Sequence, residues 1–165
     1  MEEKNLILRS VKSSDQEQIL DIVTSEKVNK TYMLPDYEAR TDAIPLFKKL
    51  MALSEDNNRF VRCIALEDTA IGYINDVEIK DGAIELGYVI HPEYHNKGYM
   101  TAALSLAIEE LFRIGYRRVI CGAFSGNKAS MRVMEKCGMK RIQYTDIIEY
   151  RGVSHQCIYY CCEQR

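Results

Sequence analysis

The stretch from Glu85 to Ala103 joins an apolar run, a polar loop with a glycine and a helical repeat. Residues 86–90 are an unbroken apolar run with β-branched and aromatic members, which predicts a buried strand. Pro92 ends it, because proline cannot continue a hydrogen-bonded ladder. After the loop at 95–98, apolar residues recur at helical spacing. The stretch therefore predicts a strand, a short basic loop and a helix, in that order.

This order creates a place where an anion can bind. The N–H groups of a first helical turn have no acceptor within the helix, and they carry partial positive charge. Gly98 lets an anion approach the backbone, and Lys97 adds a charge that His95 could increase. The natural guest is a phosphate, above all a pyrophosphate. The alternative is an ordinary helix start with an incidental lysine.

The loop can be compared with known phosphate-binding loops by its spacing. A P-loop needs two glycines followed by Lys-Ser/Thr, and a dinucleotide-binding loop needs three glycines. Neither pattern is present here. The loop resembles instead the pyrophosphate loop of the GNAT N-acetyltransferase superfamily, which reads Gln/Arg, x, x, Gly, x, Gly/Ala. Gly98 matches the first glycine, whereas His95 replaces Gln/Arg and Met100 replaces the small residue.

A second motif follows the next predicted strand. It starts at Asn127, has Ser130 three residues later, and ends in Glu-Lys-Cys-Gly-Met at 135–139. Alone it predicts only a capped helix with a glycine at its C-terminus. It is also similar to the second GNAT motif, which falls at the same strand–helix junction. Two motifs in the right order extend the resemblance over nearly the whole chain.

The resemblance implies where acetyl-CoA would bind. The pantetheine arm would pair with the backbone of residues 88–90 as an added strand does, and the pyrophosphate would rest on residues 95–101. A backbone N–H near Ile90 would polarise the thioester carbonyl. The implied cofactor-binding residues are Tyr88, Val89, Ile90, His95, Asn96, Lys97, Gly98, Tyr99, Met100, Thr101 and Asn127.

The resemblance also implies catalytic residues. Many family members have a tyrosine acid one residue before Glu-Lys, where this chain has Met134. In lacking this tyrosine, the chain resembles the RimJ/RimL ribosomal-protein N-terminal acetyltransferase branch. In that branch a serine of the second motif is the acid, and a glutamate of the next strand is the base. The matching residues are Ser130 and Glu149, although each could be a structural or solvated residue. Glu85, on the central strand, is a rival base.

The remaining patterns complete one mixed α/β domain over residues 1–165. Ser14 and Glu17 predict a capping box for the first helix. Turn-like triplets at 67–69, 80–82 and 151–153 separate consecutive strands. Strands are predicted at 6–9, 60–66, 71–79, 83–90, 119–124, 140–150 and 154–162, and helices at 14–24, 41–53, 99–115 and 127–136. The order is β-α-α-β-β-β-α-β-α-β-β, a GNAT-like, mostly antiparallel sheet with one parallel pair that the resemblance implies is splayed for the cofactor.

Composition and charge limit the classes of binding partner that the chain could have. The formal net charge of the 165 residues is −2, so no basic field would attract nucleic acid. No apolar run approaches the roughly 20 residues of a membrane span, and no signal-peptide pattern opens the chain, so a cytoplasmic location without a membrane partner is expected. The six cysteines lack zinc-type spacing with histidine, so neither a metal nor disulfides are expected.

Three functions stay open on the sequence alone. The first is acetyl transfer from acetyl-CoA to a primary amine, with a protein N-terminal α-amino group as a candidate acceptor. The second is acetylation of a small amine such as a polyamine, an amino acid or an antibiotic. The third is a non-catalytic acyl-CoA-binding module. The sequence leaves the acceptor open, because acceptor loops vary on a common fold, and it allows either a monomer or a homodimer.

Overall fold

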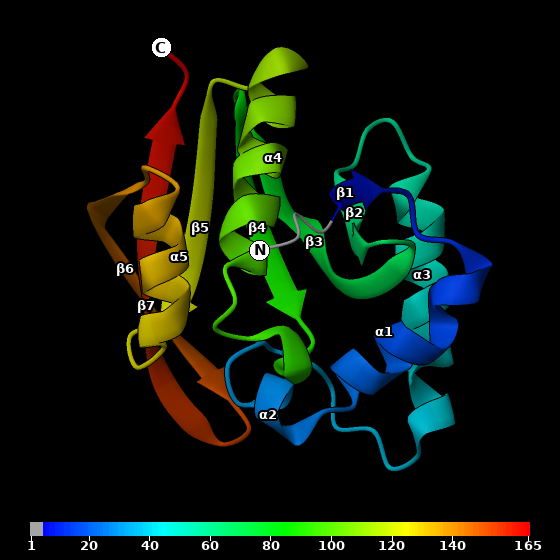
Figure 1. Cartoon of the computed structure of the whole chain (residues 1–165). Coiled ribbons are helices and arrows are strands. Elements are labelled where there is room, and N and C mark those ends of the chain that lie inside the picture. Colours follow the sequence, from blue (N-terminus) through cyan, green and yellow to red (C-terminus); the bar gives the residue numbers. More distant parts are fainter. Residues whose placement is uncertain (1–4) are drawn as a thin grey trace. The chain divides into compact units, whose positions relative to one another are not determined.

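A computed structural model describes residues 5–165 of the chain (Figure 1). Across these residues, seven strands form one sheet in the order β1-β2-β3-β4-β5-β7-β6. The strands are β1 (Leu6–Arg9), β2 (Val61–Leu66), β3 (Thr69–Lys80), β4 (Ala83–Ile90), β5 (Arg118–Phe124), β6 (Lys140–Tyr150) and β7 (Val153–Glu163). The α-helices are α1 (Gln16–Val23), α2 (Glu26–Asn29), α3 (Ile44–Ser54), α4 (Tyr99–Arg113) and α5 (Lys128–Lys136). The predicted mixed α/β fold is confirmed.

The described chain divides into two compact units. The first comprises the residues up to Asn75 together with Tyr88–Ala103, and the second comprises Asp76–Gly87 with Leu104–Arg165. Strands β3 and β4 and helix α4 therefore each contribute to both units. The single domain expected over 1–165 stays a prediction.

The first unit is built on an antiparallel meander. β1 pairs with β2, and β2 pairs with β3 from Val61↔Asn75 to Leu66↔Thr69. Helices α1 and α3 pack side by side (Figure 1). The apolar residues of both helices recur every three or four positions, so one stripe of each is buried. The core includes Ile19, Leu20, Ile22, Val23, Phe47, Leu50, Val61, Cys63 and Tyr73.

A buried ion pair changes how α1 begins. The carboxylate of Asp15, 2% exposed, accepts hydrogen bonds from Arg9 at 2.8 and 2.9 Å and from the backbone N–H of Lys12 at 2.8 Å. Burial alone would raise the pKa of Asp15, but these bonds hold it below its ordinary value. A 3₁₀ turn at Ser13–Asp15 precedes the helix, whose N-cap is Asp15. The predicted capping box of Ser14 and Glu17 is therefore wrong, because the tertiary ion pair organises this segment.

Three strand pairs are joined by turns in which both central residues have a positive φ. These turns are Glu67-Asp68 (49° and 71°), Asp81-Gly82 (52° and 80°) and Arg151-Gly152 (54° and 75°). This combination defines the type I′ turn, whose twist suits a two-residue antiparallel hairpin. The predicted turn triplets are confirmed at all three places.

The second unit contains the parallel pair of the sheet. Residues Ala83–Leu86 of β4 pair in parallel with Arg118–Cys121 of β5, as predicted for strands that a helix separates. β5 pairs antiparallel with β7, and β7 with β6. Helix α5 lies along β5 and β7 (Figure 1) and buries Met131 and Met134.

Glycines end both helices of the second unit. Gly115 has a φ of 116° and follows the last turn of α4, where Tyr116 N–H donates to the Leu111 carbonyl at 3.0 Å. Gly138 has a φ of 81° just after α5. A left-handed glycine in this place lets the next N–H groups cap the last helical carbonyls. Among residues 5–165, no helix is both long enough and apolar enough to span a bilayer.

Candidate active site

The predicted anion-binding loop forms in the first unit between β4 and α4. After Ile90, a 3₁₀ turn (Pro92–Tyr94) leads into the loop, and α4 begins at Tyr99. Nε2 of His95 lies 2.9 Å from the carbonyl oxygen of Ile90. Because a carbonyl only accepts, Nε2 carries the proton in this contact. His95 therefore ties the loop back to the end of β4.

Two residues of the loop adopt the left-handed backbone conformation, Asn96 with a φ of 60° and Gly98 with 81°. Glycine takes this conformation at no steric cost, and asparagine tolerates it. The first backbone bond of α4 runs from Ala102 N–H to the Gly98 carbonyl at 3.1 Å, so the N–H groups of Tyr99 and Met100 have no acceptor within the helix. The structure thus has the local geometry that an anion requires.

The loop is open to solvent and carries the positive charge of Lys97, and both features suit an anion. Asn96, Lys97 and Gly98 are exposed, and a side chain built on Gly98 would meet nothing within 4 Å. The Lys97 ammonium lies 5.9 Å from the centre of the Tyr94 ring, which keeps it over the loop. Thr101 is half-buried and Met100 is 8% exposed. Met100, which replaces a small residue of the motif, packs into the core.

The end of β4 is anchored to β3 within the same unit. Val89 and Ile90 are buried, and Tyr88 is half-buried. His91 N–H donates to the Ile71 carbonyl at 2.7 Å. The strands approach so closely here that a Cβ atom on Gly72 would overlap the carbonyl oxygen of Val89. The backbone at residues 88–90, expected to receive pantetheine, is therefore held on its β3 side.

The second motif lies in the second unit at the start of α5. Asn127 is the N-cap of the helix, and its Oδ1 accepts a hydrogen bond from Ser130 N–H at 3.2 Å. This bond satisfies one N–H of the first turn. Ser130 is half-buried, whereas Met134 is fully buried at 0% exposure. Position 134 thus contributes to packing, and Ser130 is the hydroxyl that α5 presents.

The two candidate bases lie on opposite faces of the sheet of the second unit. Glu149 is exposed on β6 opposite Ser154, while Glu85 is half-buried on β4 opposite Ile120, which pairs with Cys161 of β7. Side chains alternate between the two faces along a strand. Odd-numbered residues of β7, such as Cys161, therefore share the face of Glu85, and even-numbered residues, such as Ser154, share the face of Glu149. Tyr160 belongs to the second set and donates to Glu135 of α5 at 3.0 Å. Glu149 therefore shares a face with α5, as Ser130 does.

The pKa of Glu85 is raised, first by burial and then by the negative charge of Glu78. A carboxylate with this environment has the property expected of a general base. The electrostatics of the site thus favour Glu85 as the base, whereas its position on the face away from α5 favours Glu149. Both remain candidates.

An aromatic cluster at the end of β5 was not predicted from the sequence. The rings of Phe124 and His155 stack with centres 4.2 Å apart and planes at 14°, and Tyr150 lies 6.2 Å from Phe124. Ser125 N–H also donates to the Gln156 carbonyl at 2.8 Å, and Asn127 N–H donates to the Phe124 carbonyl at 2.8 Å. The cluster fixes the segment that leads into Asn127. A lone histidine in an alternating strand gave no sequence signal for it.

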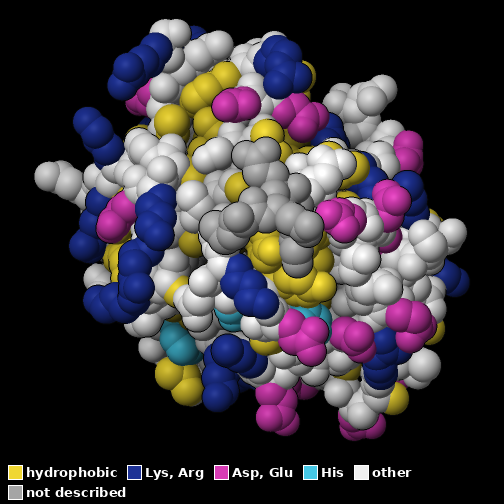
Figure 2. Space-filling view, viewed as in Figure 1, with side chains coloured by type: hydrophobic (Ala, Val, Ile, Leu, Met, Phe, Trp, Pro, Cys, Tyr) yellow, Lys and Arg dark blue, Asp and Glu magenta, His cyan; other side chains and the backbone are white. Residues whose placement is uncertain are grey.

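Basic side chains cover the outer side of α5. Lys128, Arg132 and Lys136 recur every four residues and are exposed, as are Lys140 and Arg141 of β6. Figure 2 shows Lys and Arg side chains gathered on its left side, where α5 and β6 lie. Such a group attracts an anionic ligand to this unit. No group of three or more His, Cys, Asp or Glu side chains within residues 5–165 is placed to hold a metal ion.

The chain is similar to known acetyltransferases. The family model described as "Acetyltransferase (GNAT) domain" matches residues 5–140. The chain is 27% identical over 147 residues to the uncharacterized N-acetyltransferase YoaA of Bacillus subtilis (strain 168), covering 86% of this chain and 82% of YoaA.

Two solved structures share this fold and bear names that point to different acceptors. The spermidine N-acetyltransferase of Vibrio cholerae, in complex with CoA and spermine, aligns with a TM-score of 0.80 at 18% identity, covering 96% of this chain and 95% of that one. RimL, a ribosomal L7/L12 alpha-N-protein acetyltransferase, aligns with a TM-score of 0.82 at 17% identity, covering 96% of this chain and 90% of that one. At these identities the likeness shows the fold alone.

Proposed function

The chain belongs to the acetyltransferase (GNAT) family and is an acetyl-CoA-dependent N-acetyltransferase, and from this we propose that its acceptor is a primary amine, with a protein N-terminal α-amino group as the first choice. The observation that carries the choice is the arrangement of α5. Met134 is buried where many members have the tyrosine acid, and Ser130 and Glu149 lie on the same face. This is the pattern of the RimJ/RimL-like branch.

In this proposal the first unit holds the cosubstrate. The loop from His95 to Thr101 takes the pyrophosphate on the N–H groups of the first turn of α4, with Lys97 as the added charge. The backbone of residues 88–90 takes the pantetheine arm as an extra strand would pair. Buried Val89 and Ile90, anchored through His91 to β3, make that backbone rigid. The family resemblance assigns a further hydrogen bond to the cofactor to Asn127, the N-cap of α5.

The chemistry that the acid–base residues must supply is modest. A neutral amine attacks the thioester carbonyl, the amine proton leaves, and the CoA thiolate departs. An α-amino group has a pKa of about 7.7–8.0, so a fraction is already neutral near pH 7, whereas a lysine amine at about 10.4 is almost fully protonated. Glu149, exposed to water, takes the remaining proton and passes it to solvent, and Ser130 donates to the leaving sulfur. This demand fits an α-amino acceptor better than a lysine side chain.

The alternative is a small-molecule amine acceptor. Its support is the equally good structural match to a spermidine N-acetyltransferase and the two carboxylates, Glu78 and Glu85, on the other face of the second unit. A cationic amine could be recognised there without a peptide.

An acceptor screen that detects the free thiol of CoA separates the two. The panel contains peptides with free N-termini, the same peptides with blocked N-termini, spermidine and free amino acids. We expect thiol release with the free peptides and none with the blocked ones, and Glu149→Gln should reduce that release. Release with spermidine or amino acids but not with peptides would replace the proposal by the alternative.

A further inference from the structure

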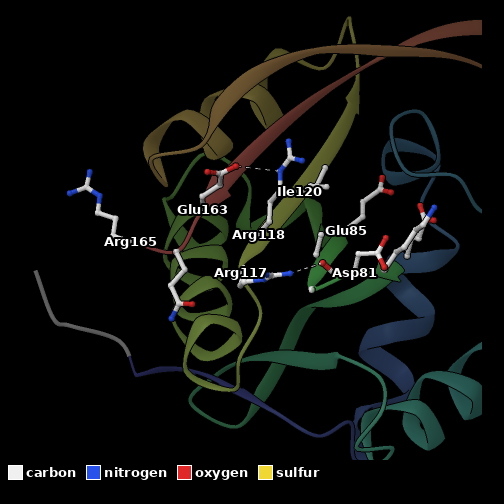
Figure 3. Close-up of a pocket in the computed structure, with 12 residues that line it drawn as sticks. Asp81, Glu85, Arg117, Arg118, Ile120, Glu163 and Arg165 are labelled. Atoms are coloured by element: carbon white, nitrogen blue, oxygen red, sulfur yellow. Dashed lines mark hydrogen bonds and ion pairs between the residues drawn. The ribbon is translucent and has the colours of Figure 1, made fainter.

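The second unit contains a hollow of about 830 Å³ that plays no part when Glu149 is the base and a protein N-terminus is the acceptor (Figure 3). It lies at the end of the sheet where β3 turns into β4 and where β5 begins. Four acidic and four basic side chains line it, and its other lining residues include the small Ala83 and the apolar Ile120. A volume of this size is typical of ligand pockets, which span about 300–1,000 Å³.

The strand register arranges the lining in two rows. Ala83 pairs with Arg118, which pairs in turn with Glu163, and the two-residue turn at 81–82 places Lys80 beside Ala83. Two residues further along, Glu85 pairs with Ile120. Counting back from the turn at 81–82 brings Glu78 opposite Glu85, in agreement with the effect of its charge on the pKa of Glu85. Rows two residues apart on one strand are about 6.6 Å apart. The first row therefore has two cations and the carboxylate of Glu163, and it lies next to a row with two carboxylates and no cation.

The small side chain of Ala83 opens the first row. Lys80 and Arg118 flank it from the neighbouring strands, so an anionic group placed above Ala83 can reach both. Arg118 can still donate hydrogen bonds to such an anionic group. Its Nε is buried and has no hydrogen-bond partner, and its contact with Glu163 is a long 3.9 Å. Arginine binds a carboxylate best through two parallel N–H groups, and Arg118 makes no such bond within residues 5–165.

The second row lacks a cation. Glu78 and Glu85 face each other across β3 and β4, and like charges in directly opposed positions destabilise a sheet. Neither carboxylate forms an ion pair within residues 5–165. Arg117 does not fill this role, because its Nη2 donates to the Asp81 carbonyl at 3.3 Å and its guanidinium packs against Gly82 (Figure 3). An ammonium group between the two carboxylates would relieve their repulsion.

We propose that this hollow binds a small zwitterion of the dipeptide type, with its carboxylate above Ala83 between Lys80 and Arg118 and its ammonium against Glu85 and Glu78. The equal numbers of acidic and basic side chains exclude a preference for polyanions or polycations, because each would meet like charges. An extended dipeptide spans the distance between the rows, whereas the charges of a single α-amino acid are closer together. The proposal rests on the proposed function with Glu149 as the base, because a Glu85 base or a small cationic acceptor would use the same two carboxylates.

The hollow is separate from the second motif of the same unit. β5 begins at Arg118, which lines the hollow, and ends at Phe124, next to the segment that leads to Asn127. Six residues of strand span about 20 Å. A dipeptide in the hollow therefore does not contact Asn127 or Ser130.

The test is an amide NMR titration of the full chain with glycylglycine near neutral pH, without acetyl-CoA. We expect saturable shifts at residues that line the hollow, with a dissociation constant of up to about 10 mM for a ligand of this size. N-acetylglycylglycine lacks the ammonium and glycylglycinamide lacks the carboxylate, so each should bind at least about tenfold more weakly. Equal binding of either blocked peptide, or no saturable shift at the hollow, would overturn the proposal.

Matched variants test which side chain binds the carboxylate of the dipeptide and which binds its ammonium group. Arg118→Gln should weaken glycylglycine about tenfold or more but leave glycylglycinamide unchanged, because only glycylglycine has a carboxylate to lose. Glu85→Gln should weaken glycylglycine and leave N-acetylglycylglycine unchanged. Arg113→Gln and Glu109→Gln, exposed charges of α4, are the controls and should change neither. If Glu85→Gln does not fold, the Arg118→Gln pair of titrations decides alone, and a loss for both peptides there contradicts the assigned orientation.

Discussion

Glu149 and Glu85 lie on opposite faces of one sheet, with Glu149 on the face that α5 covers and Glu85 on the other. One thioester cannot be served by two bases that point in opposite directions. The position of Ser130 on α5 and the environment of Glu85 support different candidates, so the base is an experimental question with two distinct outcomes.

The first prediction concerns this base. Glu149→Gln keeps the size of the side chain and removes the proton acceptor, so turnover should fall by about 10²–10⁴-fold while acetyl-CoA binding is retained. Initial rates with one good acceptor at several pH values measure this, with Glu85→Gln as the comparison. If instead only Glu85→Gln loses turnover and the low-pH limb of its profile, Glu85 is the base.

The second prediction uses the bond between His95 and Ile90. His95→Ala removes the 2.9 Å contact that ties the loop to β4, so acetyl-CoA should bind about tenfold more weakly because a hydrogen bond that orders the loop is lost. His95→Gln restores a donor and introduces a residue usual in the family motif, so it should recover most of the affinity. Calorimetric titration measures both. Equal affinities for all three proteins would show that the contact does not order the site.

The third prediction compares two glycines at opposite ends of α4. Gly98→Glu places a negative charge where the pyrophosphate would bind and should abolish acetyl-CoA binding. Gly115→Glu is the matched control, because Gly115 also has a positive φ and open space around a built Cβ atom. Gly98→Glu costs a backbone strain of about 1–2 kcal/mol. Gly115→Glu costs at least as much, because its φ of 116° lies further from the left-handed region, so a loss confined to Gly98→Glu reflects where the charge is placed. Loss of binding in both variants would point to destabilisation rather than to a phosphate site.

The fourth prediction concerns stability and pH. Burial, followed by the charge of Glu78, raises the pKa of Glu85 above its ordinary 4.5. The folded state therefore binds this proton more readily than the unfolded chain, and stability falls as pH rises from 4.5 through the raised pKa. Glu85→Gln should raise the unfolding midpoint near pH 7 and lose this advantage near pH 4. Thermal unfolding across this range tests it, with Glu109→Gln as an exposed control, and a lower midpoint for Glu85→Gln at neutral pH would contradict it.

The fifth prediction concerns the close approach of β3 and β4. Gly72→Ala would drive a Cβ atom into the Val89 carbonyl oxygen, and the backbone of both strands must shift to relieve the overlap. The expected cost is about 2–4 kcal/mol of unfolding free energy, in the range of overpacked cores. Gly126→Ala, with nothing within 4 Å of a built Cβ atom, is the control and should cost far less. Denaturant unfolding of the three proteins measures both values.

The elements themselves could be predicted from the sequence. β4 was predicted at its observed bounds, and the turns at Asp81-Gly82 and Arg151-Gly152 were predicted from their residues. These features depend on neighbours along the chain, since apolar periodicity sets the element and the turn residues set the sign of φ. The two motifs also gave the loop at Gly98 and the cap at Asn127, because a strand-to-helix junction is a local structure.

The arrangement of charged and aromatic side chains could not be predicted in the same way. The partnership of Arg9 and Asp15 replaced the expected cap at Ser14, and the stacking of His155 on Phe124 had no signal in either segment. Both contacts join residues from different elements. Sequence periodicity says which residues are apolar, but not which polar group a buried carboxylate will meet.

By itself, the sequence determined the order of the strands and of the longer helices, the parallel pair and the two family motifs, but it missed the four-residue helix α2 (Glu26–Asn29). Only the tertiary structure decided that Glu85 and Glu149 face opposite sides, and that Glu78, Glu85 and Arg118 gather around one hollow. The reason is the strand register, which is fixed by packing between distant segments. A shift of one residue along a strand would move every one of these side chains to the other face of the sheet.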